Sequence, residues 1–128
     1  MLKEPKVYFF DSGYVEGDEG IRLENTVAAC LLKHVHFLQD AKGRDISLHY
    51  IRTKDGKEVD FALAEKGVLT HFLEVKLSSD SVTRNLKYFK GAHISVKAIQ
   101  LVQNVRNEQE IEGVSLVRAG DWLAQLAA

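Results

Sequence analysis

The 128-residue sequence has few of the features that mark secreted, disulfide-stabilised or membrane-spanning proteins. Cys30 is its only cysteine, which excludes an intrachain disulfide and is typical of a reducing compartment. The longest uninterrupted apolar run, Val27 to Leu32, is too short to cross a bilayer, and the N-terminus lacks the pattern of a signal peptide. We therefore expect a soluble, cytoplasmic protein with no membrane partner.

The sequence also lacks internal repeats, low-complexity tracts and a strong net charge, and Pro5 is its only proline. Its 17 basic and 18 acidic residues leave a formal net charge of −1, so no global field indicates a polyanionic partner. Any contact with nucleic acid therefore requires a local basic surface. A chain of this length can bury a core without disulfides or metals, and we expect a single domain over residues 1–128.

The spacing of apolar residues predicts an α/β fold with a mixed sheet flanked by helices. Glycine-containing loops at Lys54–Lys57 and Glu65–Gly67 predict an antiparallel meander of three strands. A second helix follows Ser79–Ser81, whose side chains offer N-cap oxygens. The predicted helices are 20–35, 82–90 and 121–126, and the predicted strands are Lys6–Phe10, Ser47–Arg52, Glu58–Ala64, Leu69–Leu77, Ile94–Val102 and Val114–Val117.

Strand alternation places several charged residues of the meander on one face of the sheet. If the loop Glu65–Gly67 has an odd length, residues of equal parity on the two strands share a face. A solvated face with cross-strand ion pairs explains such a pattern without any function. The even face carries Glu58, Asp60, Glu74 and Lys76, and the odd, apolar face carries Val59, Phe61, Leu63, Leu69, Leu73, Val75 and Leu77.

Two observations indicate that this charged face is partly covered. Ala62, Ala64 and Phe72 share it, and a charged group beneath a cover must be paired or coordinated. Glu24 is followed by apolar residues at i+3, i+4 and i+7, so it lies on the apolar stripe of its predicted helix. We expect the Glu24 side chain to point toward the sheet.

In this interpretation Glu24, Asp60 and Glu74 converge near Lys76. Carboxylate oxygens suit Mg²⁺ or Mn²⁺, and a substrate phosphate and water complete the octahedron. Such a metal polarises a phosphoryl oxygen and lowers the pKa of a bound water, while the Lys76 ammonium holds the nucleophile or offsets developing charge. Phosphodiester hydrolysis is one hypothesis. Solvated or structural charge is the alternative, since short acid-x-lysine strings are frequent on strands.

The order of these residues resembles the PD-(D/E)XK nuclease superfamily. A helix glutamate (Glu24), an aspartate on the second meander strand (Asp60) and Glu-x-Lys on the third (Glu74, Lys76) occur within an αβββαβ order. More narrowly, "KVYFFDSG", "EGIRLENTVAACLLKH", "LHYIRTKDGKEVDFAL", "FLEVKLS" and "LKYFKG" look like the C-terminal domain of unknown function that follows the ATP-binding module of bacterial and archaeal AAA-type ATPases. This resemblance covers about residues 6 to 103 and implies a restriction-endonuclease-like fold.

The resemblance implies a role for each of these residues. Asp60, Glu74 and the main-chain carbonyl of Val75 would bind Mg²⁺ or Mn²⁺, and Lys76 would be the catalytic lysine. Glu24 would complete the site or bind the metal through water. The implied function is metal-dependent cleavage of DNA or RNA, and the alternative is a non-catalytic binding or regulatory module of an ATPase.

The resemblance also implies an ATPase module and a winged-helix-like segment as neighbours, in cis or in trans. The sequence contains no G-x-x-x-x-G-K-[ST] phosphate loop, so we do not expect the chain to be an ATPase on its own. Residues 1–13 would then be the remnant of a linker to that upstream part. An oligomer is compatible with the sequence.

Basic residues after the Glu-x-Lys motif suggest a surface for nucleic acid. Arg84, Lys87 and Lys90 recur every three residues along the predicted second helix. A solvated helix face is the favoured interpretation, and the alternative is a phosphate-contacting surface formed together with Arg52, Lys54 and Lys57. Tyr88 is a candidate for stacking on a base, and Phe89 is a candidate for stacking or for the core.

Overall fold

The computed structural model describes residues 19–79 and 81–126. The predicted strand Lys6–Phe10 and residue Asp80 lie outside the described residues. No helix in the described part is long and apolar enough to cross a membrane. The elements follow in the order α1 (Glu19–Lys42), β1 (Ile46–Arg52), β2 (Glu58–Glu65), β3 (Val68–Ser78), α2 (Arg84–Ala92), β4 (Lys97–Asn104), β5 (Gln109–Ile111), β6 (Val114–Arg118) and α3 (Ala119–Ala124).

The six strands form one mixed sheet in the order β1-β2-β3-β4-β6-β5. The antiparallel meander β1-β2-β3 is confirmed. Strand β4 joins β3 in parallel after the crossover through α2, and β6 pairs with β4 in parallel. Strand β5, which the sequence analysis did not predict, is a three-residue strand that pairs antiparallel with β6. It is too short to produce a recognisable alternation of apolar residues.

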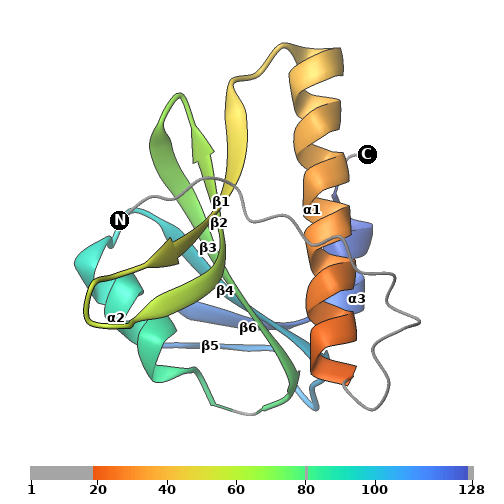
Figure 1. Cartoon of the computed structure of the whole chain (residues 1–128). Coiled ribbons are helices and arrows are strands. Elements are labelled where there is room, and N and C mark those ends of the chain that lie inside the picture. Colours follow the sequence, from red (N-terminus) through yellow and green to blue (C-terminus); the bar gives the residue numbers. More distant parts are fainter. Residues whose placement is uncertain (1–18, 80, 127–128) are drawn as a thin grey trace.

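The helices cover the two faces of the sheet, and the predicted α/β class with flanking helices is confirmed (Figure 1). On one face, Val27 and Leu31 of α1 pack against Phe61 and Leu73, and α3 joins this cluster through Ala119. On the other face, α2 buries Leu86 and Phe89 against Phe72 and its neighbours. Burial of each such side chain contributes about 1.5–3 kcal/mol, so the two apolar clusters fix where the helices lie.

Several predicted boundaries were wrong at helix ends. Helix α1 runs on to Lys42, because the buried Leu38 continues its apolar stripe, and Gly43 ends it with a φ of +63°. Helix α2 begins at Arg84 with Thr83 as its N-cap, not at Val82 with caps from Ser79–Ser81. The Thr83 hydroxyl accepts the Leu86 N–H at 3.3 Å, which satisfies one of the free donors of the first turn.

The other boundary errors lie in the C-terminal part. Strand β4 begins at Lys97 because Ile94 is 79% exposed and a turn closes from Val96 N–H to the His93 carbonyl at 3.0 Å. Helix α3 begins two residues earlier than predicted, at Ala119, which is buried against the α1 side of the sheet.

The parity rule for the meander fails at two positions. Val59 packs on the α2 side and Phe61 on the α1 side, although residues two apart in a regular strand share a face. Leu69 also packs on the α2 side, against the prediction. Register shifts occur next to both positions, in the β1–β2 pair between His49 and Ile51 and in the β2–β3 pair beside Leu63. Each shift turns the neighbouring side chains to the other face.

Candidate functional site

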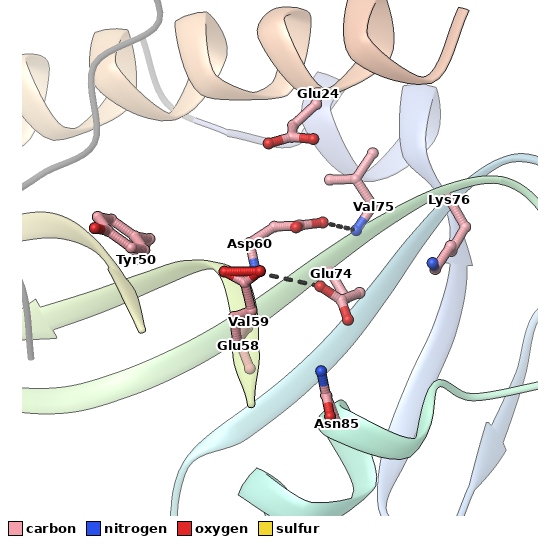
Figure 2. A pocket seen from close by; sticks show the side chains of 9 residues that line it. All are labelled: Glu24, Tyr50, Glu58, Val59, Asp60, Glu74, Val75, Lys76 and Asn85. Atoms are coloured by element: carbon pink, nitrogen blue, oxygen red, sulfur yellow. Dashed lines mark hydrogen bonds between the residues drawn. The ribbon is translucent and has the colours of Figure 1, made fainter. Parts of the chain in front are cut away.

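The main-chain pairing of β2 with β3 stops beside the predicted site. At the end of the ladder away from the β2–β3 hairpin loop, the last paired residues are Phe61 and Leu73. Asp60 and Glu74 occupy the next position. There the side chains replace main-chain partners (Figure 2). Asp60 Oδ2 accepts the Val75 N–H at 2.9 Å, and Glu74 Oε1 accepts the Asp60 N–H at 3.2 Å. The two carboxylates therefore lie between β2 and β3, beyond the last main-chain pair of the ladder.

A cavity of about 380 Å³ lies at this end of the ladder. Figure 2 shows Glu24 approaching it from α1 and Asn85 from α2, on either side of the two strands. All the residues predicted for the catalytic and metal site, including Val75, therefore line one cavity. The complete lining is Glu24, Tyr50, Glu58, Val59, Asp60, Glu74, Val75, Lys76 and Asn85.

Burial raises the pKa of both central carboxyl groups, and like charge raises that of Asp60 further. Burial, and then the charges of Glu74 and Glu24, raise the pKa of Asp60 to about 8, although the Val75 N–H opposes the shift. Burial also raises the pKa of Glu74, which is 7% exposed; its hydrogen bonds and the charge of Lys76 oppose that shift. The pair therefore keeps a proton at neutral pH, since two adjacent buried carboxylates repel each other.

The donor set of the cavity suits a hard divalent cation. Within residues 19–79 and 81–126, no three His, Cys, Asp or Glu side chains are close enough together to hold a metal ion. Glu24 therefore lies across the cavity from Asp60 and Glu74 and is not a third member of a preformed cluster. One or two carboxylates plus water are a usual Mg²⁺ environment, and a cation would remove the repulsion between Asp60 and Glu74. The residues therefore fit such an ion.

Lys76 and Val75 complete this part of the cavity. Lys76 is exposed and lines the cavity, close enough for its charge to lower the pKa of Glu74. The carbonyl of Val75 points to the same strand edge as its N–H, because both main-chain groups of a residue in an extended strand face the same neighbour. The Val75 carbonyl therefore faces the gap between β2 and β3, where Asp60 lies.

Several residues that sequence reasoning did not assign to the site also contribute to it, among them Glu58 and Val59 of the cavity lining. Tyr50 and Asn85 line the cavity, and Thr83 donates its hydroxyl to Glu74 Oε2 at 3.0 Å. The sequence did contain a signal for Thr83, because it is a polar residue at the start of the helix that follows the Glu-x-Lys motif. Tyr50 lies at the β1–β2 register shift, so strand parity carried no information about it.

The predicted basic surface is smaller than expected. Arg52, Lys54, Arg84 and Lys87 are exposed, but Lys87 pairs with Glu112 at 3.1 Å. Lys57 pairs with Asp55 at 2.6 Å and lies over the Tyr88 ring, 4.7 Å from its centroid. These two lysines are therefore already engaged within the protein.

Two candidate contacts with nucleic acid are not available in the fold, and the interpretation of Phe89 as a core residue is confirmed. The Lys90 ammonium donates to the carbonyls of Ile94 and Val96 at 2.7 and 2.8 Å, so it is not part of a free phosphate-binding surface. Phe89 is buried in the core, whereas Tyr88 is 49% exposed. Of the two aromatic residues, only Tyr88 is available to a base.

Comparison with known proteins gives one match. A family model described as a domain of unknown function (DUF4143) matches residues 19–122, which is well over half of the chain. The matched segment contains α1, the whole sheet and every residue that lines the cavity. The search of curated proteins found no match, and neither did the search of solved structures.

Proposed function

The chain belongs to the DUF4143 family of domains, and we propose that it is a Mg²⁺-dependent nuclease-like domain that hydrolyses phosphodiester bonds of DNA or RNA in the cytoplasm. The observation that carries this proposal is the pair of adjacent carboxyl groups of Asp60, which is partly buried, and Glu74, which is buried, in a polar cavity beside Lys76. A merely structural role does not require two acids at these positions. Two amide side chains could accept the same main-chain hydrogen bonds without the repulsion between carboxylates. Perturbed acids in a cavity are typical of functional sites.

We also propose that the fold is restriction-endonuclease-like. The order α1-β1-β2-β3-α2-β4, with an antiparallel meander followed by a parallel strand, supports this assignment. So does the position of the acidic pair, on the second and third strands of the meander.

In this proposal, Asp60, Glu74 and the Val75 carbonyl would hold Mg²⁺ or Mn²⁺, and Glu24 would contact the ion through water. A bound ion of this kind supplies polarisation of the phosphoryl oxygen and a lowered pKa of water. The chain itself supplies fixed oxygen ligands on two strands. Their hydrogen bonds to main-chain N–H groups hold them in place before the ion arrives.

The charge of the cavity sets the order of binding. Glu24, Glu58, Asp60 and Glu74 face a single lysine, Lys76, so the cavity without a cation repels a phosphodiester. A phosphodiester would therefore enter the cavity only once a cation had neutralised these carboxylates. The Lys76 ammonium then orients the attacking water or offsets charge on the phosphoryl oxygens.

Contacts outside the cavity position the nucleic acid through its backbone. The exposed side chains of Arg52, Lys54 and Arg84 supply positive charge near α2 and the β1–β2 hairpin, whereas the charge of Lys87 is paired with Glu112. Phosphate contacts carry little sequence information and weaken with salt. We therefore propose weak sequence preference and a steep salt dependence of binding.

The second candidate is a non-catalytic binding or regulatory module of an AAA-type ATPase. The observation that favours it is the absence, within the described residues, of a preformed group of three metal-binding side chains. Under either proposal the ATPase module acts in cis or in trans.

Metal titration combined with cleavage assays separates the two candidates. Mg²⁺ or Mn²⁺ is added to the wild type, to Asp60→Asn and to a control, Asp55→Asn, which alters an exposed acid in the β1–β2 turn. Melting temperature and cleavage of single-stranded and duplex DNA and RNA are measured. A nuclease predicts a metal-dependent rise in melting temperature and cleavage for the wild type and the control, and neither for Asp60→Asn.

Two other outcomes of the titration and cleavage assays would count against the nuclease proposal. Metal binding without cleavage of any of these substrates favours the regulatory module. The absence of both a metal-dependent shift and cleavage in the wild type contradicts the nuclease proposal.

A further inference from the structure

The hydrogen bonds around Glu74 extend beyond the cavity to the start of α2 and to a buried glutamine. Glu74 and Gln100 are neighbours in the parallel β3–β4 ladder, so their side chains lie on the same face, which α2 covers. Gln100 is completely buried. Thr83, the N-cap of α2, contacts both of them.

Thr83 makes four hydrogen bonds, one of which is the ordinary helical bond from the Lys87 N–H to its carbonyl at 3.1 Å. Its hydroxyl donates to Glu74 Oε2 at 3.0 Å and accepts the Leu86 N–H at 3.3 Å. Its main-chain N–H donates to Gln100 Oε1 at 3.0 Å. Because a hydroxyl has a single proton, accepting from the helix leaves that proton for Glu74.

Gln100 fixes the segment that carries Thr83. Its Oε1 accepts from Thr83, and its Nε2 donates to the Ser81 carbonyl at 2.9 Å. The two partners have opposite polarity, so reversing the amide would break both hydrogen bonds. The turn before α2 is therefore held on the sheet by a buried side chain whose orientation is determined.

We propose that Thr83, anchored by Gln100, is a positioning residue that orients the carboxylate of Glu74 for a divalent cation. This inference rests on the proposed function. Glu74 Oε1 accepts from the Asp60 N–H and Oε2 accepts from Thr83, so both carboxylate oxygens are held by donors. The carboxylate plane is therefore set before a cation binds, so the three side-chain torsions of Glu74 need not be ordered on binding.

Partners of metal ligands typically change metal affinity about 10- to 100-fold when they are removed. We expect Thr83→Val to weaken Mn²⁺ binding by at least about tenfold, because valine keeps the shape and loses the donor. Thr83→Ser keeps the hydroxyl and should retain the wild-type affinity. Thr83→Gly is the second test if the valine variant is poorly folded, since glycine is tolerated at an N-cap but cannot donate.

The matched control is Lys90→Met, which removes the hydrogen bonds from α2 to the Ile94 and Val96 carbonyls without touching Thr83. Isothermal titration with Mn²⁺ alone gives the dissociation constant of each folded variant, and melting temperature gives its stability. The proposal predicts weaker binding in Thr83→Val and Thr83→Gly and unchanged binding in Thr83→Ser and Lys90→Met.

Two results overturn the positioning role. One is wild-type affinity in a folded Thr83→Val or Thr83→Gly variant. The other is an equal loss of affinity in Lys90→Met, which would mean that any loosening of α2 is sufficient. A wild type that binds no Mn²⁺ is distinguishable from both, because it removes the proposed function itself and this inference with it.

Discussion

Asp60 and Glu74 each accept a hydrogen bond from a main-chain N–H of the opposite strand, at 2.9 Å from Val75 and at 3.2 Å from Asp60. These bonds take the place of the next rung of the β2–β3 ladder. The carboxylates are thus part of the sheet as well as of the cavity. This dual position makes their protonation state a property of the fold, and it leads to the first two predictions.

The stability of the metal-free protein should fall as pH rises. The pKa of Asp60 is raised from 3.8 in its ordinary state to about 8 in the fold, so the folded state binds a proton more tightly than the unfolded chain. This contribution is fully present below the unfolded pKa and is lost as pH rises through the folded pKa. Chemical unfolding followed from pH 4 to pH 9 should therefore show a decrease mainly between about pH 4 and pH 8.

Asp60→Asn is the control for this pH dependence. An amide oxygen can still accept the Val75 N–H, but the side chain no longer ionises. The variant should be more stable than the wild type near pH 8, and its stability should change less with pH. Equal slopes for the two proteins would show that Asp60 titrates normally.

Metal affinity should increase with pH over the range in which the pair loses its proton. A cation and the retained proton compete for Asp60 and Glu74, so binding releases protons. Mn²⁺ should bind more tightly at pH 8 than at pH 6, and the released protons should appear as a buffer-dependent binding enthalpy. An affinity independent of pH would contradict metal binding at this pair.

Replacement of Lys76 by methionine should separate metal binding from cleavage. The lysine lines the cavity but is not a metal ligand, so Mn²⁺ affinity should be retained or slightly increased after the positive charge is lost. Cleavage should fall by about 10²-fold or more, which is the usual effect of removing one hydrogen-bond donor that stabilises charge in the transition state. Lys33→Met, which alters an exposed lysine of α1, is the control and should cleave at the wild-type rate.

Replacement of Arg84 by alanine should weaken binding of nucleic acid without affecting the metal site. Arg84 is exposed in the first turn of α2, and loss of one phosphate contact should lower the salt slope of binding by about 1. The measurement is fluorescence anisotropy at several salt concentrations with Ca²⁺ in place of Mg²⁺. Lys90→Met should leave this slope unchanged, because its ammonium is bound to carbonyls.

Local sequence information was sufficient for most of the elements and for the central pair. Apolar periodicity and turn residues predicted the meander, helices α1 and α2 and the strand after α2. Strand parity predicted that Asp60 and Glu74 lie on one face of the meander, near Lys76. These features depend on residues that are close in sequence or joined by a short hairpin, so local patterns contain them.

Other features depended on contacts between distant segments, which no local pattern records. Parity placed Val59 and Leu69 on the wrong face because register shifts between strands are set by cross-strand pairing. The contacts of Thr83 with Glu74 and Gln100 required α2 to be docked on the sheet. The raised pKa of Asp60 required the burial that only the assembled layers provide.

Glu24 illustrates the difference between what the sequence determined and what the tertiary structure decided. Its position on the apolar stripe of α1 was evident from sequence, and the sequence by itself determined that it points toward the sheet. Helix α1 covers the face of the sheet opposite α2, whereas Glu74 points toward Thr83 on the α2 side. Only the tertiary structure decided that Glu24 and Glu74 line one cavity, because the cavity lies beyond the last main-chain pair of the β2–β3 ladder, Phe61 and Leu73, between the two helix layers.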